Sequence, residues 1–163
     1  PEDNVGTLYE KLMTTGTSLV TETVDRIAAG DIQPVEQQHI DEATLRPAPK
    51  IFKEDCRIDW EKPGREIVNF VRGLSPYPAA WTEMYREGDD EASSAKIFSA
   101  SFEPLAHGEA SGTLQSDGRT FIRVACADGW IVLGELQIAG KKRLAVRELL
   151  LGWRDVQQCR FRK

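Results

Sequence analysis

The chain has 163 residues, of which 40% are hydrophobic and 29% charged, and its formal net charge is −5. This composition is typical of a globular protein with one ordinary domain, or one small domain with an appendage, and it argues against a disordered chain. A membrane-spanning helix is excluded as well, because no stretch approaches about 18 consecutive apolar residues.

The N-terminal part of the chain predicts one long helix. The acidic residues 1–4 form no signal peptide, and because they include no initiator Met we expect the chain to begin inside a longer protein. A helix is predicted over residues 7–29, with Thr7 and Glu10 as a capping box and Gly30 as its stop. Its apolar side chains recur near helical spacing: Leu8, Leu12, Leu19, Val20, Val24 and Ile27. This stripe must be buried on the downstream domain or on a partner outside the chain.

Residues 31–49 read as a connector. They contain three prolines and show no apolar period, which favours an extended and irregular chain. We therefore place a domain boundary here.

Strand patterns dominate after the connector. A short helix is predicted after Gly64 and ends at Ser75, and a second one covers 145–151. Asp128-Gly129 between two apolar runs is the strongest hairpin signal. Five or so short strands with two small helices predict a mainly β fold, a compact β-barrel with short helices. The predicted strands are 80–86, 96–102, 113–115, 120–127 and 130–138.

A search for catalytic groups finds none. His39 and His107 belong to no motif of nucleophilic or metal-dependent catalysis, and no glycine-rich phosphate loop is present. The acidic run at 89–91 is more typical of a solvated turn than of a calcium loop. The wide spacing of the cysteines favours reduced thiols over disulfides or zinc binding, and hence a cytoplasmic protein. These cysteines are Cys56, Cys126 and Cys159.

The charges are distributed unevenly along the chain. Residues 1–45 carry nine acids and two bases, a net charge of −7, whereas residues 46–163 carry +2 and residues 141–163 alone carry +6. Basic groups at a barrel rim can neutralise phosphates without reading bases, and ordinary solubilising charges are the alternative. The basic groups in question are Lys50 with Lys53, and Lys141 with Lys142 and Arg143.

The tryptophans are a second candidate for nucleic-acid contact. An indole ring can stack on a base, but rings in small barrels are mostly part of the core. We expect core packing for the set Trp60, Trp81, Trp130 and Trp153.

Several motifs together resemble the methionyl-tRNA formyltransferase family. The residues that carry the resemblance are APKIFKED at 48–55, IDW at 58–60, RGLSPYPAAW at 72–81, LQIAGKKR at 136–143 and ELLLG at 148–152. The opening GTLYEKL at 6–12 is similar to the end of the family's catalytic domain. The match covers nearly the whole chain in the family's order, and the Ile-Asp-Trp and Pro-x-Pro-x-x-Trp elements are specific in combination.

The resemblance implies three parts. Residues 1–30 correspond to the C-terminal helix of a truncated catalytic domain, 31–49 to a linker, and 50–163 to an OB-like C-terminal domain that binds tRNA. The family transfers a formyl group from 10-formyltetrahydrofolate to the amino group of methionyl-initiator tRNA. Its folate site, Asn-x-His pair and catalytic Asp belong to a domain expected upstream, so this chain is expected to hold no catalytic, cofactor or metal site and to be inactive alone.

The resemblance also implies which residues contact tRNA. Lys50 and Lys53 match the family's basic linker positions, while Lys141, Lys142 and Arg143 match its Gly-Lys-Lys motif. A basic tail matches more loosely and consists of Arg160, Arg162 and Lys163. The implied mechanism is electrostatic, with phosphate contacts that position the acceptor arm and little base readout.

Two other interpretations remain open at this point. The same C-terminal domain accompanies 10-formyltetrahydrofolate dehydrogenase and sugar-nucleotide formyltransferases, which use no tRNA and are distinguished by the lack of a basic path from linker to tail. The other interpretation is a non-catalytic dimerisation module, in which the apolar stripe of the helix at 7–29 pairs with a second copy.

Overall fold

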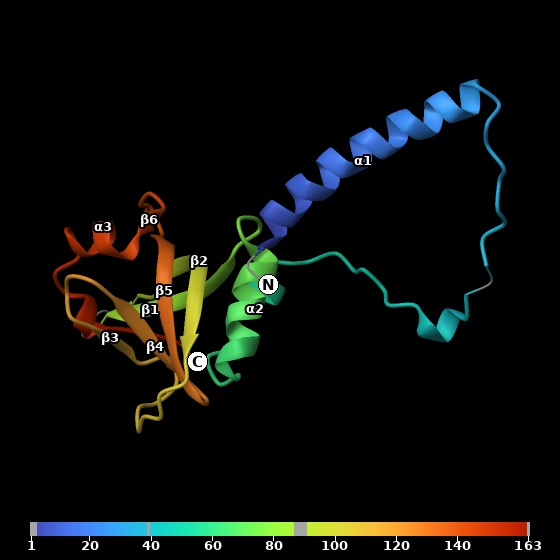
Figure 1. The fold of residues 1–163 in the computed structure, drawn as a ribbon. Helices are drawn as coiled ribbons and strands as arrows, with labels where there is room; N and C mark the ends of the chain where they lie inside the picture. The colour runs from blue at the N-terminus through green and yellow to red at the C-terminus, as the bar shows by residue number, and fades with distance from the viewer. Residues whose placement is uncertain (1–2, 39, 87–90, 163) are drawn as a thin grey trace. The chain divides into compact units, whose positions relative to one another are not determined.

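The computed structural model describes residues 3–38, 40–86 and 91–162 (Figure 1). Contacts between residues divide the chain into two compact units. The barrel unit starts at Phe52 and includes the short N-terminal stretch up to Gly6, and the second unit is Thr7–Ile51.

Helix α1 spans Val5–Ala28 and none of its residues is buried. It starts two residues before the predicted position, so Thr7 lies within its first turn and the predicted N-cap is wrong. Gly30 follows with φ +70°, the left-handed conformation in which a helix commonly ends, as predicted. The apolar stripe of α1, including Leu12 and Val20, is exposed within the described structure. No helix of the described residues is long and apolar enough to cross a membrane.

The connector after α1 contains one short 3-10 helix, η1 (Glu42–Thr44), in its described part. The carboxylate of Asp41 caps η1 by accepting a hydrogen bond from the backbone N–H of Ala43 at 3.0 Å. The other described residues between Gly30 and Phe52 form no helix or strand, as expected from the prolines. His39 lies outside the described residues.

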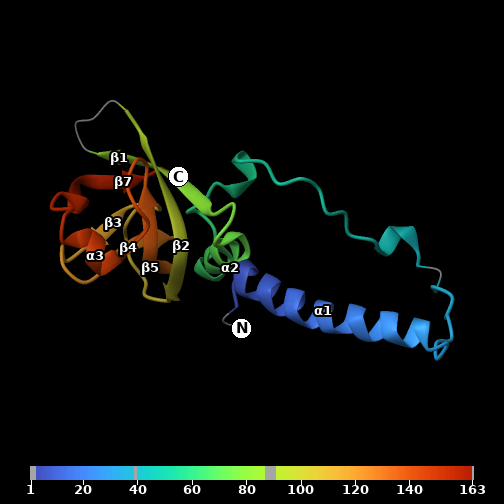
Figure 2. The same ribbon diagram turned by 90° about the horizontal axis from the view of Figure 1, so that it is seen from above.

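The barrel unit is built from one antiparallel sheet (Figures 1 and 2). Its order is β3-β4-β5-β2-β1-β7, with β6 beside β5. A bridge between Thr113 and Arg160 joins the two edges of the sheet, so the barrel is nearly closed and the predicted OB-like barrel is confirmed. The strands are β1 (Ala80–Arg86), β2 (Ser93–Glu103), β3 (Leu114–Ser116), β4 (Ile122–Cys126), β5 (Gly129–Ile138), β6 (Leu144–Ala145) and β7 (Cys159–Phe161).

Short helices pack against this sheet. Helix α2 (Gly64–Leu74) places Ile67, Val71 and Leu74 in the core, as its helical spacing predicts. The remaining short helices are η2 (Glu54–Cys56), α3 (Val146–Leu150) and η3 (Val156–Gln158).

Three of the four tryptophans belong to the core. Trp60, Trp130 and Trp153 are buried, as expected, whereas Trp81 on β1 is only partly buried. The indole N–H of Trp60 donates to Thr82 Oγ1 at 3.0 Å, and its ring stacks on Phe161 of β7 with centroids 5.5 Å apart. The core expectation therefore holds for three indoles, whereas Trp81 packs against the core and stays partly exposed.

The predicted hairpin forms with a turn one residue earlier than the sequence suggests. Ala127 and Asp128 form the turn, and Gly129 already pairs with Cys126 at the start of β5. Gly129 is required by close packing, because a Cβ atom there would lie 2.4 Å from the carbonyl oxygen of Glu103 on β2. Asp128 has a second role, since its carboxylate accepts a hydrogen bond from the N–H of Gly64 at 2.7 Å and caps α2.

The turn between β3 and β4 holds an unusually acidic carboxyl group. Asp117 accepts hydrogen bonds from the hydroxyl of Thr120 at 2.5 Å, from the N–H of Thr120 at 2.7 Å and from the N–H of Arg119 at 2.9 Å. These hydrogen bonds to the charged form hold the pKa of Asp117 well below its usual range. The folded state therefore favours the carboxylate more strongly than the unfolded chain does.

Replacing Asp117 by Asn is expected to make the free energy of unfolding depend less strongly on pH in the acidic range. The native pKa of Asp117 is depressed, so its stabilisation is present above the unfolded value of about 3.9 and is lost as pH falls through the native value. The difference in the free energy of unfolding between wild type and Asp117→Asn should therefore shrink from about pH 5 to about pH 2. Urea unfolding followed by circular dichroism measures it. An unchanged slope in Asp117→Asn contradicts the assignment.

Candidate nucleic-acid interface

The structure gives His107 a structural role. Its Nδ1 accepts a hydrogen bond from the N–H of Glu109 at 3.2 Å, so Nε2 carries the proton and donates to the carbonyl oxygen of Gly129 at 2.8 Å. The imidazole also packs against the ring of Trp130, with centroids 4.6 Å apart. Both ring nitrogens are engaged by the backbone, which leaves neither available as a general base.

The cysteines and acids offer no reactive site in the described parts of the chain. All three cysteines are buried and none forms a disulfide, and burial raises the pKa of the Cys56 and Cys126 thiols, which keeps them protonated. No group of three or more His, Cys, Asp or Glu side chains among the described residues could hold a metal ion. Asp89 and Asp90 of the predicted solvated turn lie outside the described residues.

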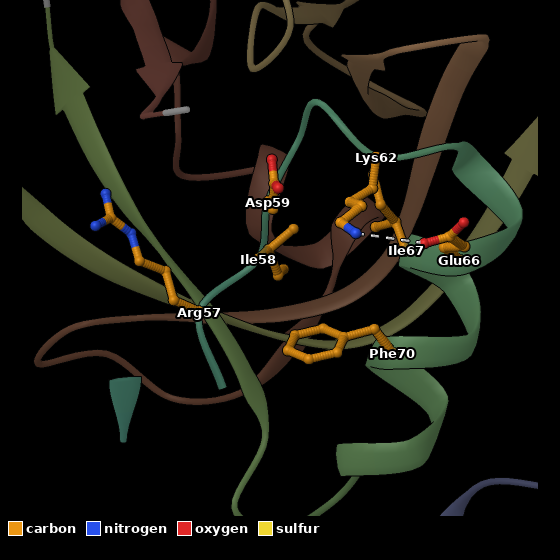
Figure 3. A pocket seen from close by; sticks show the side chains of 7 residues that line it. All are labelled: Arg57, Ile58, Asp59, Lys62, Glu66, Ile67 and Phe70. Carbon is orange, nitrogen blue, oxygen red and sulfur yellow. Dashed lines mark ion pairs between the residues drawn. The ribbon is translucent and has the colours of Figure 1, made fainter. Parts of the chain in front are cut away.

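A pocket of about 340 Å³ lies between the segment at 57–62 and helix α2 (Figure 3). Ile58, Ile67 and Phe70 provide its apolar wall, while an ion pair between Lys62 and Glu66, 3.7 Å from Nζ to Oε2, lies at its side. The Arg57 side chain points away from the other lining residues. Asp59 is the remaining polar residue of the lining.

The first predicted basic group is divided between the two units. Lys50 is exposed and belongs to the unit Thr7–Ile51, whereas Lys53 belongs to the barrel unit. The Nζ atom of Lys53 lies 5.0 Å from the ring centroid of Trp81, and the indole N–H of Trp81 donates to the carbonyl oxygen of Lys53 at 2.7 Å. Lys53 is thereby placed at the start of strand β1.

The second predicted basic group lies in the turn after β5. Lys141 and Lys142 are exposed there, and Gln137 of β5 donates its side-chain N–H to the carbonyl oxygen of Lys141 at 2.9 Å. Arg143 is bound to the barrel, because its guanidinium pairs with Glu135 and lies 4.2 Å above the ring of Phe98. Lys141 and Lys142 therefore extend into solvent, and Arg143 shares its charge with a carboxylate.

The predicted basic tail is in fact an ordered edge of the barrel. Arg160 belongs to β7, where it lies opposite Tyr85 of β1 and is exposed. Arg162 follows directly, and its Nη1 lies 3.0 Å from Glu83 Oε2 and 2.8 Å from the hydroxyl of Tyr85. Hydrogen bonding to Arg162 lowers the pKa of Glu83, so this ion pair is charged at neutral pH. Lys163 lies outside the described residues.

Two cationic residues on the same outer face were missed by the sequence analysis, which also expected their aromatic neighbour Trp81 in the core. Arg57 lies 3.2 Å from Glu83 and 5.9 Å from the Trp81 ring centroid, and Lys96 lies opposite Trp81 on β2. The signal was present in β1, where Trp81, Glu83 and Tyr85 alternate with buried residues and so share the outer face. Arg57 and Lys96 carry no comparable signal, because each stands alone among uncharged or acidic neighbours.

Comparison with known proteins gives these features a context. Residues 50–154 match the model of the family described as formyl transferase, C-terminal domain. Similar relatives include the methionyl-tRNA formyltransferase of Parabacteroides distasonis, 46% identical across 96% of this chain, and that of Bacteroides fragilis, 48% identical across 93%. The chain spans about half the length of these relatives, 48% and 47% respectively.

Solved structures with a similar fold include HypX from Aquifex aeolicus. One variant superposes with a TM-score of 0.62 at 18% identity, covering 93% of this chain and 26% of HypX. A complex of HypX with tetrahydrofolic acid gives a TM-score of 0.55 at 21% identity and covers 82% of this chain and 22% of HypX. At these identities the likeness concerns the fold alone.

Proposed function

Because the chain belongs to the formyl transferase C-terminal domain family, we propose that it is the C-terminal part of a methionyl-tRNA formyltransferase. Such an enzyme transfers a formyl group from 10-formyltetrahydrofolate to the amino group of methionyl-initiator tRNA. The observation that carries the proposal is the 46% and 48% identity to relatives of that name over more than nine-tenths of the chain. The buried cysteines, none of which forms a disulfide, support a cytoplasmic location.

The proposal divides the work between this chain and a catalytic domain. Residues 1–30 contribute the last helix of that domain, 31–49 the linker, and 50–163 the tRNA-binding barrel. Folate binding and catalysis belong to the preceding domain, which also covers the exposed apolar stripe of α1. Alternatively, a second copy of the chain buries the apolar stripe of α1. A strictly monomeric chain in a sedimentation experiment would exclude this alternative.

The barrel's part in the reaction is electrostatic. Phosphate contacts would hold the acceptor arm so that the aminoacyl end reaches the active site, without readout of bases. The proposed contact residues are Lys50, Lys53, Lys141, Lys142, Arg143, Arg160, Arg162 and Lys163. The exposed positions of Lys53, Lys141, Lys142 and Arg160 support this assignment, whereas the ion pairs of Arg143 and Arg162 leave part of their donor capacity for phosphate.

The chain alone is expected to bind an initiator tRNA transcript at low salt and to transfer no formyl group. Filter binding measures the first, and gel separation of formylated from unformylated methionyl-tRNA measures the second, with the full-length Bacteroides fragilis enzyme as positive control. Formylation by the 163-residue chain would contradict the proposal that catalysis belongs to a preceding domain. A lack of tRNA binding at low salt would contradict the tRNA role and favour a folate-dependent enzyme that uses no tRNA.

A further inference from the structure

We infer that one row of side chains across the outer face of the barrel is the track on which RNA lies. This cross-strand row consists of Arg57, Trp81, Lys96 and Gln137. It rests on the proposed function, and it goes further because Arg57 and Lys96 are absent from the basic groups identified in the sequence and because it assigns Trp81, expected there in the core, to the RNA contact.

The register of the sheet places these four side chains side by side. Arg57 forms a bridge with Trp81, Trp81 lies opposite Lys96, and Lys96 lies opposite Gln137. Residues directly opposite each other in a sheet point to the same face. The chain neighbours of the row, among them Ile58 and Ile97, are buried in the core, so the row itself faces outward. With strands about 4.8 Å apart, the row spans about 15 Å.

The row connects the two basic groups that are distant in the sequence. At one end, the ammonium of Lys53 lies 5.0 Å from the Trp81 ring centroid. At the other end, the Gln137 side chain holds the backbone of Lys141 at 2.9 Å, so the turn that carries Lys141 and Lys142 begins where the row ends. Lys96, exposed in the middle of the sheet, supplies the charge between them. A polyanion that contacts both basic groups along this face would pass over Lys96.

Glu83 positions two guanidinium groups beside the row. Its Oε2 lies 3.2 Å from Arg57 Nη2 and 3.0 Å from Arg162 Nη1, and it also accepts a hydrogen bond from the Tyr85 hydroxyl at 3.1 Å. One carboxylate between two guanidiniums leaves a net positive charge. Each guanidinium has five N–H donors, so most of them remain for phosphate oxygens. Two acids of η2, Glu54 and Asp55, follow Lys53 directly in the sequence.

The chemistry of the row fits RNA rather than a simple anion. Cations spaced along a flat face neutralise successive phosphates, and the partly exposed indole of Trp81 offers a ring on which an unpaired base can stack. Stacking tolerates any base because every base has a π-face. The row therefore binds without reading sequence, as a domain that positions tRNA requires.

Lys96→Gln tests the row directly, with Lys62→Gln as its matched control. Lys62 is also an exposed lysine of the barrel unit, but its ammonium pairs with Glu66 of α2, and the Arg57 side chain of the row points away from that pair. Losing one phosphate contact should weaken binding of a tRNA transcript about tenfold at about 50 mM salt. It should also reduce the salt slope, meaning the steepness with which the logarithm of the binding constant falls with the logarithm of the salt concentration, by about one. Lys62→Gln should bind like wild type, and Lys96→Arg should retain binding because it keeps the charge. Circular dichroism confirms that each variant is folded.

Trp81 gives a second, independent readout. The other three indoles are only 0%, 3% and 6% exposed, so RNA that contacts the row should quench the fluorescence of Trp81. Trp81→Leu should abolish that quenching and weaken binding about tenfold without changing the salt slope.

The possible results separate this inference from the proposed function. If the wild-type chain binds tRNA and both Lys96→Gln and Trp81→Leu bind it equally well, the inference about the row is wrong and the tRNA role stands. If Lys96→Gln and Lys62→Gln lose the same factor in affinity for tRNA, the inference about the row is also wrong, because the loss then reflects the net charge of the barrel and not one contact. A wild-type chain that binds no tRNA at low salt would overturn the proposed function itself.

Discussion

Raising the salt concentration from about 50 mM to about 200 mM is expected to weaken tRNA binding to this chain by on the order of a hundredfold to ten-thousandfold. The reason is counterion release, because each lysine or arginine that neutralises a phosphate frees a condensed cation. The proposed contact surface offers about five to eight such contacts, and the slope of log K against log salt is about −0.7 to −0.9 per contact. Fluorescence anisotropy of a labelled transcript measures that slope.

Arg86 of β1 and Arg162, which follows β7, provide a matched pair for this measurement. Arg162→Ala removes a cation from the proposed surface and should reduce the slope by about one. Arg86→Ala also breaks an ion pair, with Asp155 at 2.6 Å, but Arg86 alternates with the outward-facing residues of β1 and should leave the slope unchanged. A slope near zero for the wild type would mean that binding does not depend on phosphates.

Replacing Trp60 by Ala is expected to lower the free energy of unfolding by about 3–5 kcal/mol. Trp60 is fully buried, stacks on Phe161 of β7 and donates its indole N–H to Thr82 of β1. Its removal leaves a cavity between two segments that meet at the closing edge of the barrel. Since small domains are stable by about 5–15 kcal/mol in total, this loss is a large fraction of the stability. Urea unfolding followed by circular dichroism measures it.

Two further variants separate the contributions of this side chain. Trp60→Phe keeps an aromatic ring against Phe161 but loses the hydrogen bond to Thr82, so we expect a smaller loss of about 1–3 kcal/mol. Trp81→Ala is the control for an indole on the surface, where the expected loss is about 1 kcal/mol. A loss in Trp60→Ala no greater than that in Trp81→Ala would contradict the central position of Trp60.

In the described part of the chain, the imidazole and the thiols have structural surroundings. His107 is held by backbone groups, the thiols of Cys56 and Cys126 are kept protonated by burial, and Lys62 at the pocket beside α2 is paired with Glu66. The features that remain are an outer face with exposed cations and one accessible indole. This arrangement is what a positioning domain needs, because phosphate contacts orient a large RNA without chemical groups at the contact surface.

Much of the fold was predictable because its signals are local. The helical spacing of Ile67, Val71 and Leu74 identifies α2, and the apolar runs on either side of Asp128-Gly129 identify β4 and β5. The order of short motifs from 6–12 to 148–152 was sufficient to identify the family, because each motif is contiguous in the sequence. The exposed basic turn after β5 was found in the same way, from the run 141–143.

The sequence determined less wherever two distant segments must meet. The residues of β7 read as a basic tail, because three residues among arginines give too short an alternation to indicate a strand, and only pairing with β1 and the bridge to Thr113 make them the closing edge. In β2 a bulge buries both Ile97 and Phe98, which disturbs the alternation that sequence analysis relies on. Local patterns record which side of a strand is apolar, but not which strand lies beside it. The cross-strand row therefore exists only in the tertiary structure, since register alone brings Arg57, Trp81 and Lys96 onto one face.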